Sequence, residues 1–191
     1  MKTLQILFII ITSLFSFSQV QANGIEIALS SETAQFTVRS DSSLIGLGGA
    51  DLDFGLFFND DNDIVGQISL MQSRQASEGA PLTLGIGMRA YVGHLDVSSQ
   101  NILALGIGGE IRYTIPGVMP MATYLQANYA PKITSFSDTK SVADLLLGFQ
   151  IEILPQTIAF AGIRRLEIDT KTVKNFDVDD NSLHVGVRLT F

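Results

Sequence analysis

The residues best suited to catalysis lie in short segments between predicted strands. His94 and Asp96 stand two positions apart, and Asp60, Asp61 and Asp63 crowd a second segment. A histidine near carboxylates can activate water for hydrolysis, so a hydrolytic site at the rim of the fold is one hypothesis. Nothing in the spacing is diagnostic of such a site, and solvated loop charge is the interpretation that we prefer.

Metal and cofactor chemistry has less support. The segments 59–63 and 177–181 are rich in oxygen ligands and could hold Ca²⁺, but neither has the glycine and distant glutamate of an EF-hand loop. The chain has no cysteine, and its two histidines are His94 and His184, so a transition-metal site is not expected. Nucleophile-elbow and Walker A motifs are absent from the sequence. We therefore predict no catalytic residue, no metal and no cofactor.

Apolar and polar residues alternate with a period of two in several segments, and this alternation indicates the strands that carry the remaining charged residues. In Leu183–Phe191 every odd-numbered residue is apolar, whereas the even-numbered ones are His, Gly, Arg and Thr. The same alternation runs through Leu82–Val92, Leu103–Ile115, Ala143–Ile153 and Ala50–Leu56. This period is typical of β-strands with two different faces and fits no helix.

Five further segments alternate less cleanly and bring the predicted strands to ten. They are Gly24–Leu29, Ala34–Arg39, Ile64–Met71, Met121–Ala130 and Thr157–Ile168. The last of these places Arg164 beside Arg165, so either face carries a charge there. We interpret this point as a β-bulge or as the place where the strand leaves a bilayer.

These segments predict an all-β fold, an antiparallel transmembrane β-barrel of about ten strands. An even number of strands places both termini at the periplasmic end. Outward loops would then be 30–33, 59–63, 93–100, 131–141 and 169–181, and the periplasmic turn at 72–80 is longer than this class of barrel usually has. The alternative is eight strands, with residues 23–43 outside the wall.

The N-terminal segment is predicted to be a signal peptide, residues 1–22. Lys2 gives it a positive start, an apolar run follows from Leu4 to Phe17, and Val20-Gln21-Ala22 provides small residues at positions −3 and −1. A single transmembrane anchor is the alternative, but the apolar run is shorter than the ~20 residues that a spanning helix needs. Cleavage after Ala22 would leave one domain, residues 23–191.

Composition and the C-terminus point to the bacterial outer membrane. A mean hydropathy of +0.31 with 16% charged residues suits a barrel with a lipid-facing wall. The predicted signal peptide and the terminal Phe191 favour such a barrel over a soluble β-sandwich. The pI of about 4.6 argues against nucleic acid as a partner. The expected partners are the lipid bilayer, lipopolysaccharide and the outer-membrane assembly machinery. Phe191 ends an unbroken apolar face and is expected to be an assembly signal.

Twelve charged residues fall on the face opposite the apolar one and would line the lumen. They are Glu26, Arg39, Asp51, Asp53, Arg89, Glu110, Arg112, Asp144, Glu152, Arg165, Glu167 and Arg188. The interior of so small a barrel is mostly filled by side chains, so we predict a structural or surface-interaction barrel plugged by ion pairs. The alternative is a narrow cation-preferring channel. Inward glycines such as Gly106 and Gly108 would make room for water or for long arginine side chains.

Several short motifs, in their order along the chain, resemble the YfaZ family of outer-membrane proteins. They are Gly24–Ser31, the Asp51–Gly55 segment before its acidic turn, Gly106–Tyr113, Tyr129-Ala130-Pro131, Gly162–Arg165 and Val185–Phe191. The resemblance spans the whole predicted mature chain. It implies a small outer-membrane barrel of Gram-negative bacteria and implies no settled activity.

Overall fold

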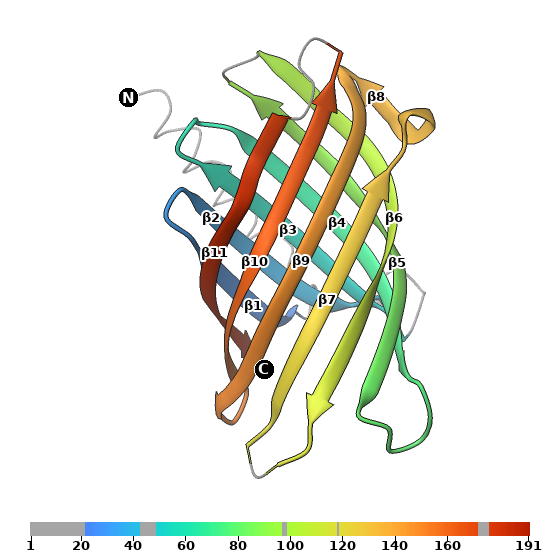
Figure 1. Cartoon of the computed structure of the whole chain (residues 1–191), viewed down its shortest axis with the longest axis vertical. Helices are drawn as coiled ribbons and strands as arrows, with labels where there is room; N and C mark the ends of the chain where they lie inside the picture. Colours follow the sequence, from blue (N-terminus) through green and yellow to red (C-terminus); the bar gives the residue numbers. More distant parts are fainter. Residues whose placement is uncertain (1–21, 43–48, 97–98, 118, 172–175) are drawn as a thin grey trace.

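The computed structural model describes residues 22–42, 49–96, 99–117, 119–171 and 176–191, which form one antiparallel sheet of eleven strands (Figure 1). In chain order the strands are β1 (Ala22–Leu29), β2 (Thr33–Asp41), β3 (Asp51–Asn59), β4 (Ile64–Gln75), β5 (Leu82–Leu95), β6 (Gln100–Ile115), β7 (Met121–Ala130), β8 (Ser135–Ser137), β9 (Thr139–Leu154), β10 (Thr157–Thr170) and β11 (Phe176–Thr190). A 3₁₀ turn, η2 (Lys132–Thr134), precedes β8. Within the described ranges, no helix is long and apolar enough to cross a membrane. Apart from Ala22, the predicted signal peptide lies outside the described residues.

The sheet closes on itself to form a barrel. β1 pairs with β11, from Gly24 opposite Thr190 to Leu29 opposite Val185, and β5 pairs with β6 along its whole length. β8 is three residues long and pairs with the start of β6, so it extends the rim and the other ten strands form the wall. The prediction of a ten-stranded barrel is confirmed. The eight-stranded alternative is wrong, because β1 and β2 are neighbouring strands of the wall.

The two ends of the barrel are built differently (Figure 1). We call the end where β11 finishes the C-terminal end and the opposite one the loop end. At the C-terminal end a two-residue turn, Pro155-Gln156, joins β9 to β10, and Gln156 takes a φ of 67°. The turn predicted to be unusually long is shorter in the structure because β4 runs on to Gln75. Its base is closed by the Ala76 N–H, which donates to the Leu82 carbonyl at 2.9 Å.

The outer face of the wall is apolar, as the alternation predicts. Ile86 is 75% exposed and Ile107 68% exposed, although both lie in the middle of long strands. The exposed apolar side chains of the wall include Ile27, Leu29, Phe54, Ile68, Leu84, Met88, Val92, Leu103, Leu105, Ile111, Leu145, Leu147, Phe149, Ile163, Leu183, Val185, Val187 and Leu189. The residues between them point into the barrel. The polar groups of this fold are therefore inside and much of its apolar surface is outside.

One end of the interior is an exception, because it is filled with apolar side chains. Ten residues there are at most 2% exposed and form one cluster, which we call the apolar plug. They are Phe57, Val65, Tyr91, Leu95, Ile102, Ala104, Ala130, Val142, Leu166 and Ile168. Each comes from the part of its strand nearest the loop end. The plug therefore lies at the loop end of the barrel interior, and the charged layers described below lie on its C-terminal side.

Candidate functional site

Asp144 on β9 is the centre of the most buried polar layer, directly beneath the apolar plug. Its carboxylate accepts hydrogen bonds from Arg164 Nε and Nη2 at 3.0 and 2.9 Å and from Arg89 Nη1 at 2.8 Å. The Tyr91 hydroxyl donates a fourth at 3.2 Å. The side chain of Asp144 is 1% exposed. These four residues, the Asp144 cluster, tie β5 to β9 and β10 across the interior.

Arg164 also connects this cluster to the plug and to a strand elsewhere in the wall. Its guanidinium carbon lies 5.3 Å from the centre of the Phe57 ring, which belongs to the plug. Its Nη1 donates to Gln35 Oε1 on β2. A planar guanidinium suits this position because it can stack on a ring and donate in several directions at once. Arg164 thus joins strands from different sides of the barrel.

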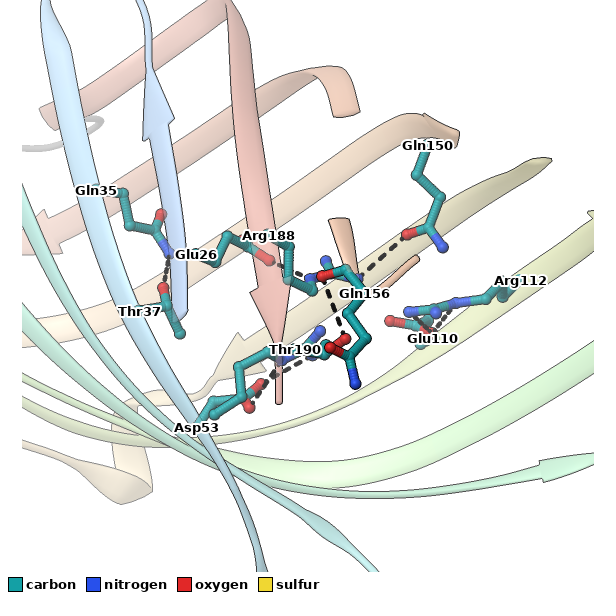
Figure 2. A network of polar contacts seen from close by, with 11 residues as sticks. Glu26, Gln35, Thr37, Asp53, Glu110, Arg112, Gln150, Gln156, Arg188 and Thr190 are labelled. Atoms are coloured by element: carbon teal, nitrogen blue, oxygen red, sulfur yellow. Dashed lines mark hydrogen bonds and ion pairs between the residues drawn. The ribbon is translucent and has the colours of Figure 1, made fainter. Parts of the chain in front are cut away.

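Three more ion pairs lie closer to the C-terminal end and form a second layer. Arg188 Nε donates to Glu26 Oε2 at 2.7 Å, and its Nη1 donates to Gln150 at 3.3 Å. Figure 2 shows these three side chains near the Arg112–Glu110 pair, whose closest approach is 2.9 Å. The third pair joins Arg39 to Asp53 by two parallel hydrogen bonds of 3.1 and 3.2 Å. We call these six charged residues the ion-pair ring.

The ring separates two spaces of different character. On its inner side, toward the Asp144 cluster, lies a cavity of about 70 Å³ that Gly55, Gln67, Ser69 and Arg89 help to line. On its outer side an open vestibule of about 450 Å³ faces the C-terminal end, and its lining includes Asp51. All six residues of the ion-pair ring line the inner cavity, and all but Glu26 also line the vestibule. The polar interior is therefore a blind vestibule that leads toward a small inner cavity and ends at the plug.

Inward glycines lie beneath bulky side chains in this interior. A Cβ at Gly148 would collide with the ring of Tyr124, and a Cβ at Gly186 would collide with the ring of Phe160. At Gly108 it would meet the Asn128 side chain. The prediction that these glycines make room for water or for crossing arginines is therefore wrong at these positions, where they admit rings and an amide. Because these side chains pack directly over the glycines, they leave little continuous space along the lumen.

Most of the twelve predicted lumen charges take part in this interior, but two do not. Arg165 and Glu167 lie on the outer face of β10, opposite Leu145 and Ala143, and pair with each other at 3.3 Å. Arg164, which was not among the predicted lumen charges, takes the inward position. Every second residue counted from the inward Phe160 also points inward, so the same alternation would have placed Arg164 in the lumen. The β-bulge predicted here is present. The pairing of β10 with β11 shifts register between Arg164 and Leu166 and again between Leu166 and Glu167.

The remaining predicted charges lie at the C-terminal end, and other inward polar residues were missed. Asp51 is exposed in the vestibule, and Glu152, near the end of β9, is half-buried. Gln35, Gln67 and Tyr91 bind or adjoin the charged clusters but were not singled out, because neutral polar residues give no charge signal in the sequence.

The rim residues considered for hydrolysis hydrogen-bond to neighbouring groups at the rim. His94 Nδ1 lies 3.0 Å from Asn101 Oδ1. Asp63 is buried, and its oxygens accept hydrogen bonds from the Asn59 amide at 2.9 Å and the Asp96 N–H at 2.8 Å. These bonds stabilise the loops themselves. Among the described residues no three His, Asp or Glu side chains gather as metal ligands. The side chains of 177–181 lie outside the described residues.

Comparison with known proteins adds little beyond the general fold. No protein-family model matches the chain, and no curated protein matches it. The outer membrane channel DcaP of Acinetobacter baumannii is 10% identical, with a TM-score of 0.39 over 87% of this chain and 54% of the channel. An anion-selective porin from Comamonas acidovorans is 14% identical, with a TM-score of 0.34 over 83% of this chain and 49% of the porin. The chain spans about half the length of each, and likenesses this slight indicate no function.

Proposed function

We propose that this chain is a small barrel of the bacterial outer membrane whose lumen is closed, so that it serves as a structural or surface-interaction barrel and not as a pore. The observation that carries the proposal is the apolar plug. Its ten residues are at most 2% exposed, which supports closure of the lumen by apolar side chains at the loop end. Beneath it, the Asp144 cluster crosses the interior with three charged side chains bound to one another.

The outer wall supports the membrane location. A soluble barrel would bury its apolar face and expose polar residues, whereas this one exposes apolar residues along nearly every strand. Its longer strands have 14 to 16 residues, more than the 9–11 that a tilted strand needs to cross the hydrocarbon core. The YfaZ resemblance and the predicted signal peptide agree with this location, and in this proposal the C-terminal end faces the periplasm.

The loop end carries one ordered projection suited to surface interaction. Residues 131–138 form η2 and β8, held by Thr134 and Ser135 hydroxyls that donate to the Pro131 carbonyl at 3.1 and 2.9 Å. Ile133 is 86% exposed and Phe136 is 55% exposed on this segment. Apolar side chains held out beyond the barrel wall favour contact with lipopolysaccharide or with another surface component.

Conductance measurements test the proposal. The refolded mature chain, residues 23–191, is inserted into planar bilayers, with a conducting porin in a parallel experiment as the positive control. We expect no single-channel steps from the barrel at any voltage at which the control conducts. Reproducible steps that depend on the amount of inserted barrel would contradict a closed lumen and favour the narrow channel.

A further inference from the structure

The outer face of β10 is recessed between the strands beside it. β10 lies between β9 and β11 in the wall, and β1 follows β11 (Figure 1). Two outward positions of β10 are alanines, Ala159 and Ala161, and both are half-buried. Their partners on β9 and β11 are all larger: Ile151, Phe149, Val187 and Val185. The short alanine side chains therefore form the floor of a depression whose sides are the larger neighbours.

This depression is an open groove of about 640 Å³ on the outer wall, which we call the β10 groove. It extends across β11 to β1, where Ile27 and Leu29 lie opposite Val187 and Val185 and complete its lining. Every residue of that lining is apolar. With neighbouring strands about 4.8 Å apart, the groove measures roughly 14 Å from β1 to β9. It therefore has room for acyl chains that lie side by side.

A charged pair ends the apolar run on the same face of β10. Beyond Ala161, toward the loop end, the outward residues are Ile163, Arg165 and Glu167. Arg165 Nη2 lies 3.3 Å from Glu167 Oε2, and Arg165 is exposed. Leu145 of β9 lies opposite Arg165, so the pair borders the apolar wall. Ionisable groups on a lipid-facing surface are costly and usually functional, and a lipid headgroup is the polar partner available at this place.

The spacing between the pair and the β10 groove fits one lipid molecule. Arg165 lies four residues beyond Ala161, which is about 13 Å along the strand. The hydrocarbon of one leaflet is half of the bilayer core, or roughly 15 Å. A headgroup at Arg165 therefore places its acyl chains over Ala161 and Ala159. The loop end is the outer side in the proposed membrane orientation, so this lipid belongs to the outer leaflet.

The signs of the charges indicate the kind of headgroup. The Arg165 guanidinium can donate to a phosphate, and the Glu167 carboxylate beside it can accept from an ammonium group. The charged residues that follow on β10 and at its end are Asp169 and Lys171, one of each sign. Because the charges balance, this part of the wall suits a zwitterionic headgroup better than one with several negative charges.

We propose that the outer face of β10 binds one glycerophospholipid with a phosphoethanolamine headgroup. Arg165 binds the phosphate, Glu167 binds the ammonium group, and the acyl chains lie in the β10 groove over Ala161 and Ala159. The site is a surface for a specific lipid on the wall of the barrel. It rests on the proposed membrane location and does not depend on whether the lumen is closed.

Native mass spectrometry of the refolded mature barrel in detergent tests the site by measuring bound lipid. Phosphatidylethanolamine and phosphatidylglycerol with the same acyl chains are compared, because both have a phosphate and only the first has an ammonium group. We expect phosphatidylethanolamine to bind about tenfold more tightly, the effect of one hydrogen bond between charged groups. Glu167→Gln should remove this preference. Arg165→Gln should weaken both lipids about tenfold, and Ala161→Phe should weaken both by filling the groove.

Matched controls are available elsewhere on the outer wall. Arg74→Gln changes an exposed arginine near the C-terminal end of β4, and Ala90→Phe changes an outward alanine of β5 outside the groove. Both variants should bind the two lipids as the wild type does. If Arg165→Gln does not fold, Arg165→Leu makes the same test with a side chain that suits an apolar wall.

Three results would overturn the proposal. They are equal losses in the control and site variants, a wild type that does not distinguish the two phospholipids, and tighter binding of lipid A than of phosphatidylethanolamine in the same assay. Insertion of the same preparation into phosphatidylcholine vesicles separates this inference from the proposed function. A chain that does not insert would contradict the membrane location and this site with it, whereas an inserted barrel without lipid preference would contradict the site alone.

Discussion

Neutralising Asp144 should destabilise the barrel more than any other single loss of charge in its interior. The carboxylate is 1% exposed and accepts hydrogen bonds from two arginines and a tyrosine. Removing one partner of a buried ion pair leaves an uncompensated charge and costs about 3–5 kcal/mol. Asn retains one oxygen acceptor, so we expect about 3 kcal/mol for Asp144→Asn. That is roughly a hundredfold change in the unfolding constant, at about 1.4 kcal/mol per factor of ten.

The assay is urea unfolding of the refolded barrel in lipid vesicles, followed by circular dichroism and by heat-modifiable gel migration. Overlap of the folding and unfolding titrations establishes equilibrium. The matched control is Glu167→Gln in the outward Arg165–Glu167 pair, where the arginine side chain is 46% exposed and the cost should be smaller than for Asp144→Asn. An Asp144→Asn barrel within about 1 kcal/mol of the wild type would refute the reasoning that the Asp144 cluster holds the interior together.

Three further changes probe the wall, the packing of the interior and assembly. Leu105→Arg on the exposed outer face should cost about 2–4 kcal/mol in bilayers if the residue lies near the midplane, and a neutral result in vesicle unfolding would show that the faces are misassigned. Gly148→Val should cost about 1–3 kcal/mol by overpacking against Tyr124, and adding Tyr124→Ala should recover part of that loss in the same assay. Deleting Phe191 should reduce the yield of barrel in the outer membrane when expressed at low level, because the assembly signal is lost, and normal insertion would speak against that role.

The strands of the wall and their two faces could be predicted from the sequence, because the alternation of side chains along a strand depends only on neighbouring residues. Neighbouring residues of a strand point to opposite faces, so a period of two identifies both the strand and its faces without knowledge of its partners. Leu183–Phe191 and Leu82–Val92 are clear examples. The same rule could not choose between Arg164 and Arg165, because two adjacent charges satisfy either face. Only the alternation counted from Phe160, or the pairing with β9, places Arg164 inside.

The layers of the interior were not predictable, because they depend on contacts between distant strands. Asp144 and Arg89 are 55 residues apart and meet only after the barrel has closed with a particular stagger. The apolar plug was not predicted from the sequence, for a related reason. Its members, such as Val65 and Ile168, are inward residues at strand ends, where the sequence suggests loops or a change of face. Their common position is set by strand tilt, which no local pattern specifies.

Chemical access to the vestibule tests the closed barrel most directly. The chain has no cysteine, so a single Thr114→Cys places the only thiol in the vestibule, where Thr114 lines the wall. A membrane-impermeant maleimide should not label this thiol in intact cells and should label it once the outer membrane is permeabilised, whereas Lys132→Cys on the loop-end projection should react in both. Labelling of Thr114→Cys in intact cells would show that the lumen is open from the outside, or that the barrel is oriented the other way, and would contradict the account.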